Sequence, residues 1–163
     1  MIQIIDGTVF IDDTEKFLLK IKQISKEQNI VIQALDADKL AGEKHLSFAV
    51  EKATNSFKKG TNIANDLAKE IMLYAAGTRQ INKAMRLGVH NGKNNITLVA
   101  VGEAPDLSAF NEIIPKNVLH YDESKKNALM DIFNITKEEL EAVGEDKLPE
   151  LVLERVALVD VIK

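Results

Sequence analysis

The sequence predicts an α/β fold, with a small mixed β-sheet flanked by several α-helices in a single domain. Short apolar runs typical of strands alternate along the chain with segments in which apolar residues recur at helical spacing. The chain has 163 residues, which is enough for one domain with a sizeable core. No repeat and no Pro- or Gly-rich linker marks a boundary, so we expect residues 1–163 to form one domain.

The composition is that of an ordinary globular protein, with 45% hydrophobic and 28% charged residues. The absence of cysteine excludes disulfides, a thiolate nucleophile and cysteine-ligated metals. The N-terminus has neither the charged nor the apolar region of a signal peptide, and no apolar run approaches the ~18 residues of a membrane span. These features favour a cytoplasmic protein.

The N-terminal elements are predicted by turn and capping signals. Asp6-Gly7 lies between two apolar stretches and predicts the turn of a β-hairpin. Asp12 with Glu15 resembles a capping box, which predicts a helix after it. Residues 30–35 are apolar and predict a buried strand, and a helix is expected after the turn at residues 36–38.

Two helices are predicted in the middle of the chain. Thr61 or Asn62 is expected to cap a helix that ends at Gly77. A second helix is expected between Thr78 and Gly88.

The C-terminal half is predicted to contain a central strand and further helices. Residues 96–101 are apolar on both faces, as in a central strand. A short helix is expected around residues 107–110 and an edge strand at residues 118–121. A second capping box is expected at residues 136–139, and Pro149 is expected in the first turn of the last helix.

The segment from Lys58 to Lys93 is basic although the chain is acidic. It holds seven Lys or Arg residues and two acidic residues, on a chain with a net charge of −4. Such an island suggests a localised polyanion site. Arg79, Lys83 and Arg86 are spaced i, i+4 and i+7, so on one helix they would form an exposed ridge. The alternative is a solvated face without a binding function.

No catalytic or metal-binding motif is evident. The three histidines, at positions 45, 90 and 120, are far apart and lack metal-ligand spacing. The segment from Gly88 to Asn94 resembles a phosphate loop, but its spacing and its place after a helix argue against one. Nothing combines a nucleophile, a base and an oxyanion site. We therefore expect a binding protein that is not an enzyme and uses no cofactor or metal.

The stretch from Lys59 to Ala84 resembles the central signature of a known family. It reads Lys-Gly-Thr-Asn-x-Ala and then Glu-Ile-x-Leu-Tyr-x-Ala-Gly-Thr-Arg-Gln-Ile-x-x-Ala. On this motif the chain is similar to KEOPS-complex subunits related to the PRPK-binding protein, and Ala-Gly-Thr-Arg-Gln is typical of archaeal members. The apolar strand at residues 96–101 and the apolar C-terminal helix also match the family.

The resemblance implies a non-catalytic subunit with two partners. Members of the family bind a small kinase-like ATPase and recruit tRNA through its single-stranded 3′ CCA end. The assembled complex installs threonylcarbamoyl on the adenosine beside the anticodon (t6A), with catalysis in another subunit. We expect the RNA-binding residues to lie in the central segment and to be Lys59, Asn62, Arg79, Gln80, Lys83 and Arg86.

The roles expected of these residues differ. The cations would hold phosphates, whereas Asn62 and Gln80 could hydrogen-bond base edges or sugars. Tyr74 shares a helix face with Leu67 and Ile71, so we expect it to pack in the core rather than to stack on a base.

The last helix is the candidate surface for the kinase-like partner, through Leu151, Val152, Arg155 and Val159. The alternative is that its apolar residues all belong to the protein's own core. Two other functions remain open. One is a protein-binding scaffold that regulates the kinase-like subunit without RNA contact, and the other is a small-molecule-binding or enzymatic α/β domain.

Overall fold

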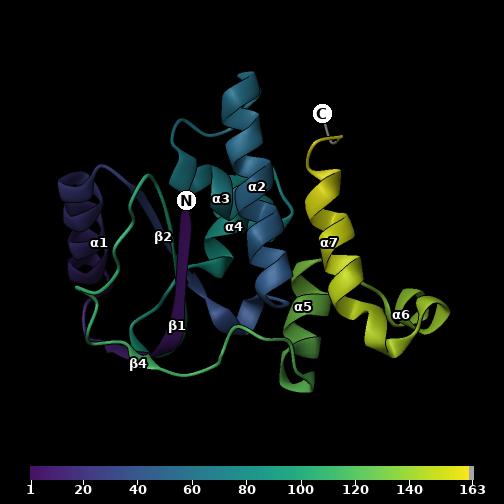
Figure 1. Cartoon of the computed structure of the whole chain (residues 1–163). Helices are drawn as coiled ribbons and strands as arrows, with labels where there is room; N and C mark the ends of the chain where they lie inside the picture. Colours follow the sequence, from purple (N-terminus) through teal and green to yellow (C-terminus); the bar gives the residue numbers. More distant parts are fainter. Residues whose placement is uncertain (162–163) are drawn as a thin grey trace. The chain divides into compact units, whose positions relative to one another are not determined.

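The computed structural model describes residues 1–161, which group into two compact units (Figure 1). Unit 1 comprises Met1–Ala37 and Gly88–Val118, and unit 2 comprises Asp38–Leu87 and the chain from Leu119 onward. The α/β class, with a small sheet and several helices, is confirmed. The organisation of residues 1–163 as a single domain stays a prediction.

Unit 1 is a four-stranded sheet with one long helix. The strands lie in the order β2 (Val31–Asp36), β3 (Gly92–Val101), β1 (Ile2–Ile11) and β4 (Ile114–Pro115). All pairings among the described strands are antiparallel, so the sheet is not of mixed direction as predicted. Helix α1 (Thr14–Gln28) joins β1 to β2, which run in the same direction, but β3 lies between them and no parallel pair forms.

The core of unit 1 lies between the sheet and α1. Phe17, Ile21 and Ile24 form the buried face of α1. The central strand β3, predicted over residues 96–101, contributes Ile96, Leu98 and Ala100, which are fully buried. This prediction is confirmed. Val99, which alternates with these residues and therefore faces the other side of the sheet, is buried as well, so this part of the strand is buried on both faces.

Asp6-Gly7 lies inside β1 and does not form the predicted hairpin turn. A Cβ atom at Gly7 would lie 2.1 Å from the carbonyl oxygen of Ile114, so the close approach of β4 requires a glycine here. Asp6 holds the same edge because its Oδ2 accepts a hydrogen bond from the backbone N–H of Val118 at 2.9 Å. The dipeptide therefore serves strand pairing rather than chain reversal.

Three other local predictions are wrong. Residues 107–110 form turns rather than a helix, because the N–H of Phe110 donates to the carbonyl of Leu107, three residues back. The short edge strand is β4, and residues 118–121 form no strand. The N-cap of α1 is Asp13 rather than Asp12, and its side chain accepts the N–H of Glu15.

Unit 2 is helical. Its three longest helices, α2 (Glu43–Lys59), α3 (Leu67–Ala76) and α7 (Leu148–Leu158), pack on one another (Figure 1). The shorter helices are α4 (Ile81–Ala84), α5 (Lys126–Ile132) and α6 (Lys137–Val143). Single 3₁₀ turns of this unit are η2 (Met85–Leu87), η3 (Glu123–Lys125) and η4 (Glu145–Lys147), and a further one, η1 (Ala37–Lys39), begins at the last residue of the first segment of unit 1. None of the helices described within residues 1–161 has the length and apolarity to cross a membrane.

Several predicted helix ends in unit 2 are confirmed. Gly77 ends α3 in the left-handed conformation, with φ 64°. Thr136 caps α6, since its side chain accepts the N–H of Glu139 at 3.0 Å. Pro149 lies in the first turn of α7. These ends are determined by neighbours in the sequence, which is why local patterns found them.

Candidate functional site

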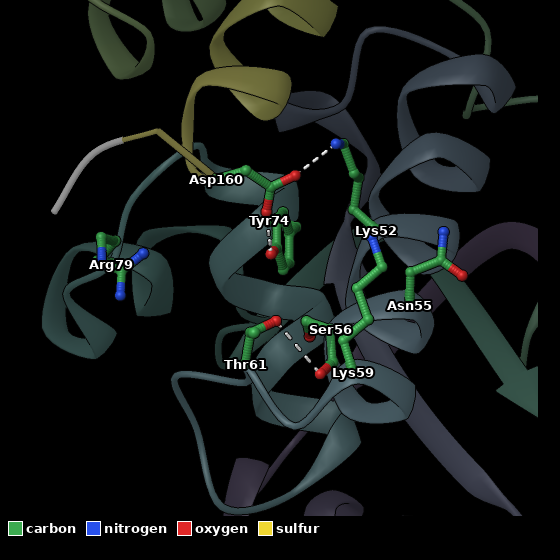
Figure 2. Close-up of a pocket in the computed structure, with 8 residues that line it drawn as sticks. All are labelled: Lys52, Asn55, Ser56, Lys59, Thr61, Tyr74, Arg79 and Asp160. Atoms are coloured by element: carbon green, nitrogen blue, oxygen red, sulfur yellow. Dashed lines mark hydrogen bonds and ion pairs between the residues drawn. The ribbon is translucent and has the colours of Figure 1, made fainter.

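A pocket of about 610 Å³ opens in unit 2 (Figure 2). Its walls come from α2, from the segment after it, from α3, from the connection between α3 and α4, and from the end of α7. Three lining residues are cations and one is an acid; the full set is Lys52, Asn55, Ser56, Lys59, Thr61, Tyr74, Arg79 and Asp160. The volume falls in the range of roughly 300–1,000 Å³ in which proteins bind small ligands or ligand ends.

Helix α2 supplies one wall because four of its polar residues are spaced at i, i+3, i+4 and i+7. These are Lys52, Asn55, Ser56 and Lys59. This spacing places them along one side of the helix. The helix ends at Gly60, which is left-handed with φ 70°, and the N–H of Thr61 then bonds the carbonyl of Ser56 at 2.9 Å. That bond turns Thr61 back to the pocket.

Asp160 forms one end of the pocket. Its Oδ1 accepts a hydrogen bond from the Tyr74 hydroxyl at 2.5 Å, and its Oδ2 forms an ion pair with Nζ of Lys52 (Figure 2). The Asp160 side chain is still 40% exposed. Nearby, the guanidinium of Arg79 donates to the carbonyl of Val159 at 3.2 Å. Residues from α2, from α3, from the segment between α2 and α3 and from the segment between α3 and α4 therefore surround the end of α7.

The charges in the pocket leave it net positive. Burial opposes ionisation of Asp160, but hydrogen bonds from Lys52 and Tyr74 and the charges of Lys52 and Lys59 outweigh it, so the Asp160 pKa lies below its usual value. Burial and the bond to Asp160 raise the pKa of Tyr74. Its hydroxyl is thus a proton donor at neutral pH. With three cations and one carboxylate, the pocket favours an anionic group.

The loop before α3 replaces the first turn of the predicted helix. Neither Thr61 nor Asn62 is the cap; α3 begins at Leu67, and Asp66 caps it by accepting the N–H of Lys69 at 2.8 Å. The predicted start of this helix at Thr61 or Asn62 is therefore too early.

Buried Glu70 holds this loop in place. Its carboxylate is fully buried and accepts the N–H of Ile63 at 3.0 Å and of Ala64 at 2.7 Å. The Ser56 hydroxyl donates to the same carboxylate at 2.7 Å. These bonds satisfy the charge and fix residues 61–66 as a loop folded around an acid on α3.

The predicted ridge of Arg79, Lys83 and Arg86 does not form. Helix α4 has only four residues and η2 follows it, so Arg79 precedes the helix and the three residues do not share one helical face. Among the apolar residues of this segment, Ala84 is buried, whereas Ile81 is 43% and Met85 58% exposed. The apolar face is too small to support a longer helix.

The predicted RNA-binding residues therefore separate into two groups. Lys59 and Arg79 line the pocket, whereas Asn62, Gln80, Lys83 and Arg86 do not. Arg86 forms an ion pair with Asp131 at 2.8 Å, and Nδ2 of Asn62 donates to the carbonyl of Ala64 at 2.8 Å. Lys83 and Gln80 are exposed. Whether any of these residues contacts RNA stays a prediction.

Five pocket residues were not predicted as site residues from the sequence: Lys52, Asn55, Ser56, Thr61 and Asp160. Lys52 could have been identified from the sequence, because it lies two helical turns before Lys59 on the same predicted helix. Asp160 lies far away in sequence and carried no signal. Tyr74 is only 3% exposed, which agrees with the predicted core packing, but its hydroxyl reaches the pocket.

The apolar residues predicted for partner binding are buried in unit 2. Leu151 is 6% exposed, and Val152 and Val159 are fully buried. Arg155 makes two bonds of 2.7 Å to the Glu139 carboxylate and one of 3.1 Å to the carbonyl of Phe133. The proposed contact surface therefore needs correction, because α7 uses this face to pack against its own unit.

A second face of α7 borders a groove of about 500 Å³ with α2. Its apolar residues are Phe48, Leu153 and Ala157. Its charged residues are three acids and one base: Glu51, Glu150, Glu154 and Lys44. Helix α7 therefore has a second apolar face, formed by Leu153 and Ala157 and distinct from the buried face that contains Val152.

No group of three or more His, Asp or Glu side chains within residues 1–161 is arranged to hold a metal ion.

The model of a protein family described as kinase binding protein CGI-121 matches residues 12–160. This match covers most of the chain, including every residue of the pocket. The chain belongs to the CGI-121 family. One relative in sequence is the regulatory protein Cgi121 of Methanocaldococcus jannaschii, which is 31% identical over 135 residues. The aligned region covers 80% of this chain and 84% of that protein. The family predicted from the central motif is therefore confirmed.

Proposed function

We propose that this CGI-121 family member is a non-catalytic KEOPS subunit that binds the kinase-like ATPase and recruits tRNA by its 3′ CCA end for t6A formation. Binding of the kinase-like ATPase is supported by the family description. The M. jannaschii relative is named a regulatory protein, which favours a non-catalytic role, and its source favours an archaeal-type member. The RNA half is carried by one observation. A net-positive pocket of nucleotide-binding size contains Lys59 and Arg79 from the central motif.

The chemistry of the pocket suits the end of a single strand better than a duplex. Cations at Lys59 and Arg79 would bind phosphates, while Asn55 and Thr61 offer neutral polar groups to sugars or bases. A recessed pocket admits an unpaired terminal nucleotide, whereas a duplex presents its backbone along a surface. The 3′ CCA end of tRNA is such an unpaired terminus.

The direct test is a titration of the full chain with intact tRNA and with tRNA trimmed of CCA. Trimming is expected to remove most of the binding, because the pocket then loses its ligand while the remaining duplex surface is unchanged. Equal affinity for the two RNAs would refute recruitment through the CCA end. If the protein binds the kinase-like subunit but does not bind RNA, the result supports the alternative function, a purely protein-binding scaffold.

The pocket itself is tested by Lys59→Ala and Arg79→Ala. Each removes a charge-assisted contact, and each is expected to weaken tRNA binding by about tenfold. Lys58→Ala is the matched control, since Lys58 is the neighbouring lysine on α2 but does not line the pocket. If Lys58→Ala is as damaging as Lys59→Ala, the pocket is not the binding site.

For the kinase-like partner we favour the groove between α2 and α7. The groove combines apolar residues with a mainly acidic rim, so a partner surface with apolar and basic groups would fit it. Ala157→Arg adds a bulky cation to this groove, which would repel a basic partner surface, and is expected to abolish capture of the kinase-like subunit while leaving the melting temperature unchanged. Unaltered capture would exclude the groove as the docking surface.

A further inference from the structure

Asp160 is an unexpected residue in a pocket that attracts phosphates. An ionised carboxylate repels a phosphate group, so Asp160 weakens the attraction of its own part of the pocket for phosphate. Asp160 is paired with Lys52. Within residues 1–161, neither Lys59 nor Arg79 forms an ion pair with a carboxylate, and Figure 2 shows these two cations on opposite sides of Tyr74. Lys59 and Arg79 are thus the cations of the pocket whose charge no carboxylate balances.

The Asp160 carboxylate has acceptor capacity left over. A carboxylate offers about four lone-pair sites, and Tyr74 and Lys52 take one on each oxygen. The side chain is 40% exposed, so its remaining lone pairs are accessible from the pocket. Lys52 and Tyr74 hold the carboxylate in one orientation (Figure 2). A fixed, partly exposed carboxylate is suited to ligand groups that donate hydrogen bonds.

We propose that Asp160 is a specificity residue that accepts hydrogen bonds from the 2′- and 3′-hydroxyls of a terminal ribose. The pocket would then select RNA ends with a free 2′,3′-diol, with the preceding phosphates at Lys59 or Arg79. Carboxylates bind ribose hydroxyls in this way in other nucleotide sites. This inference rests on the proposed function, since it specifies which RNA end the same pocket accepts.

The same residue would exclude other ends. A 3′-phosphate brings up to two further negative charges next to Asp160, which lies among groups that keep it ionised. A terminus without hydroxyls leaves the carboxylate without its donors. Discrimination would therefore come from both a lost attraction and an added repulsion.

The test compares three versions of one acceptor-stem RNA hairpin ending in CCA. The first has the natural 2′,3′-diol, the second a 3′-phosphate, and the third a 2′,3′-dideoxy terminus. Each is titrated into the full-length wild-type protein and into Asp160→Asn. Asp131→Asn is the matched control, because it also removes one carboxylate from an ion pair in unit 2 but lies outside the pocket.

The wild type and Asp131→Asn are expected to bind the diol end about tenfold more tightly than either altered end. Asp160→Asn is expected to lose most of this preference and to bind the 3′-phosphate end more tightly than the wild type does. A gain of binding cannot arise from misfolding, so this result is specific.

Two results overturn the inference alone. In one, the wild type binds all three ends equally but still requires CCA; in the other, Asp160→Asn keeps the full wild-type preference. If the wild type does not distinguish CCA from a trimmed end at all, the proposed function fails as well.

Discussion

His45 and Lys125, which are buried in unit 2, have defined hydrogen-bond partners. Nδ1 of His45 accepts the N–H of Ala41 at 2.9 Å, and its Nε2 lies 2.8 Å from the carbonyl of Ala75. These partners require the neutral ring with its proton on Nε2. Buried Lys125 donates to the carbonyl of Leu119 at 2.9 Å. Each of these hydrogen bonds joins a buried side chain to a backbone group elsewhere in unit 2, so the two side chains hold parts of the unit together.

His45 makes the stability of the protein depend on pH. Burial, only partly offset by the bond to Ala75, lowers the His45 pKa from 6.5 to about 4. Between these values the unfolded chain binds a proton that the folded protein does not, so the free energy of unfolding decreases as the pH falls from 6.5 to 4. The full loss is about 3 kcal/mol, of which about 2 kcal/mol is expected by pH 5.

Urea unfolding at pH 7 and pH 5 measures this loss. The control is His90→Gln, which removes an exposed histidine and is expected to keep the same difference between the two pH values. Equal stability of the wild type at the two pH values would contradict the role of His45.

Among the elements, the loop before α3 depends on one carboxylate. Glu70→Gln replaces an acceptor oxygen with a donor that faces the N–H groups of Ile63 and Ala64. We expect a loss of about 2 kcal/mol in the free energy of unfolding and faster amide exchange in residues 61–66. Glu51→Gln, an exposed change on α2, is the control and is expected to alter neither. Unchanged exchange in the loop would contradict the role of Glu70.

Helix α7 has a core face and an open face, which two neighbouring residues distinguish. Val152 is fully buried and Leu153 lies in the groove. Val152→Ala is expected to lower the free energy of unfolding by about 2 kcal/mol, because it leaves a cavity. Leu153→Ala is expected to lower it by less than about 1 kcal/mol and to weaken partner binding instead. Reversal of the two stability effects would show that the faces are assigned wrongly.

On the scale of the whole molecule, a chain of net charge −4 carries a positive pocket. Binding of a single RNA strand releases counterions, with a slope of log affinity against log salt of about −0.7 per phosphate contact. Lys59 and Arg79 together predict a slope near −1.4, and about −2 if Lys52 also contributes. Titrations of tRNA across a salt series measure it, and Lys59→Ala is expected to reduce the slope by about 0.7. A flat response would exclude phosphate binding by the pocket.

Patterns in the sequence were sufficient to predict the family, the α/β class, the central strand and several helix ends. These features depend on local patterns, such as the central motif from Lys59 to Ala84, the apolar run of residues 96–101, and Gly77 after a helix. Asp6-Gly7 shows the limit of such patterns, because a glycine required by a neighbouring strand reads the same as a glycine in a turn.

The candidate site, in contrast, depends on contacts between segments that are far apart in the sequence. Lys59 and Arg79 were found from sequence, but Asp160 joins them because α7 packs against α2 and α3. The same packing buries Val152 and leaves Leu153 at the groove. Amphipathic periodicity shows that a helix has apolar faces, whereas the face that enters the core is determined by contacts between residues far apart in the sequence.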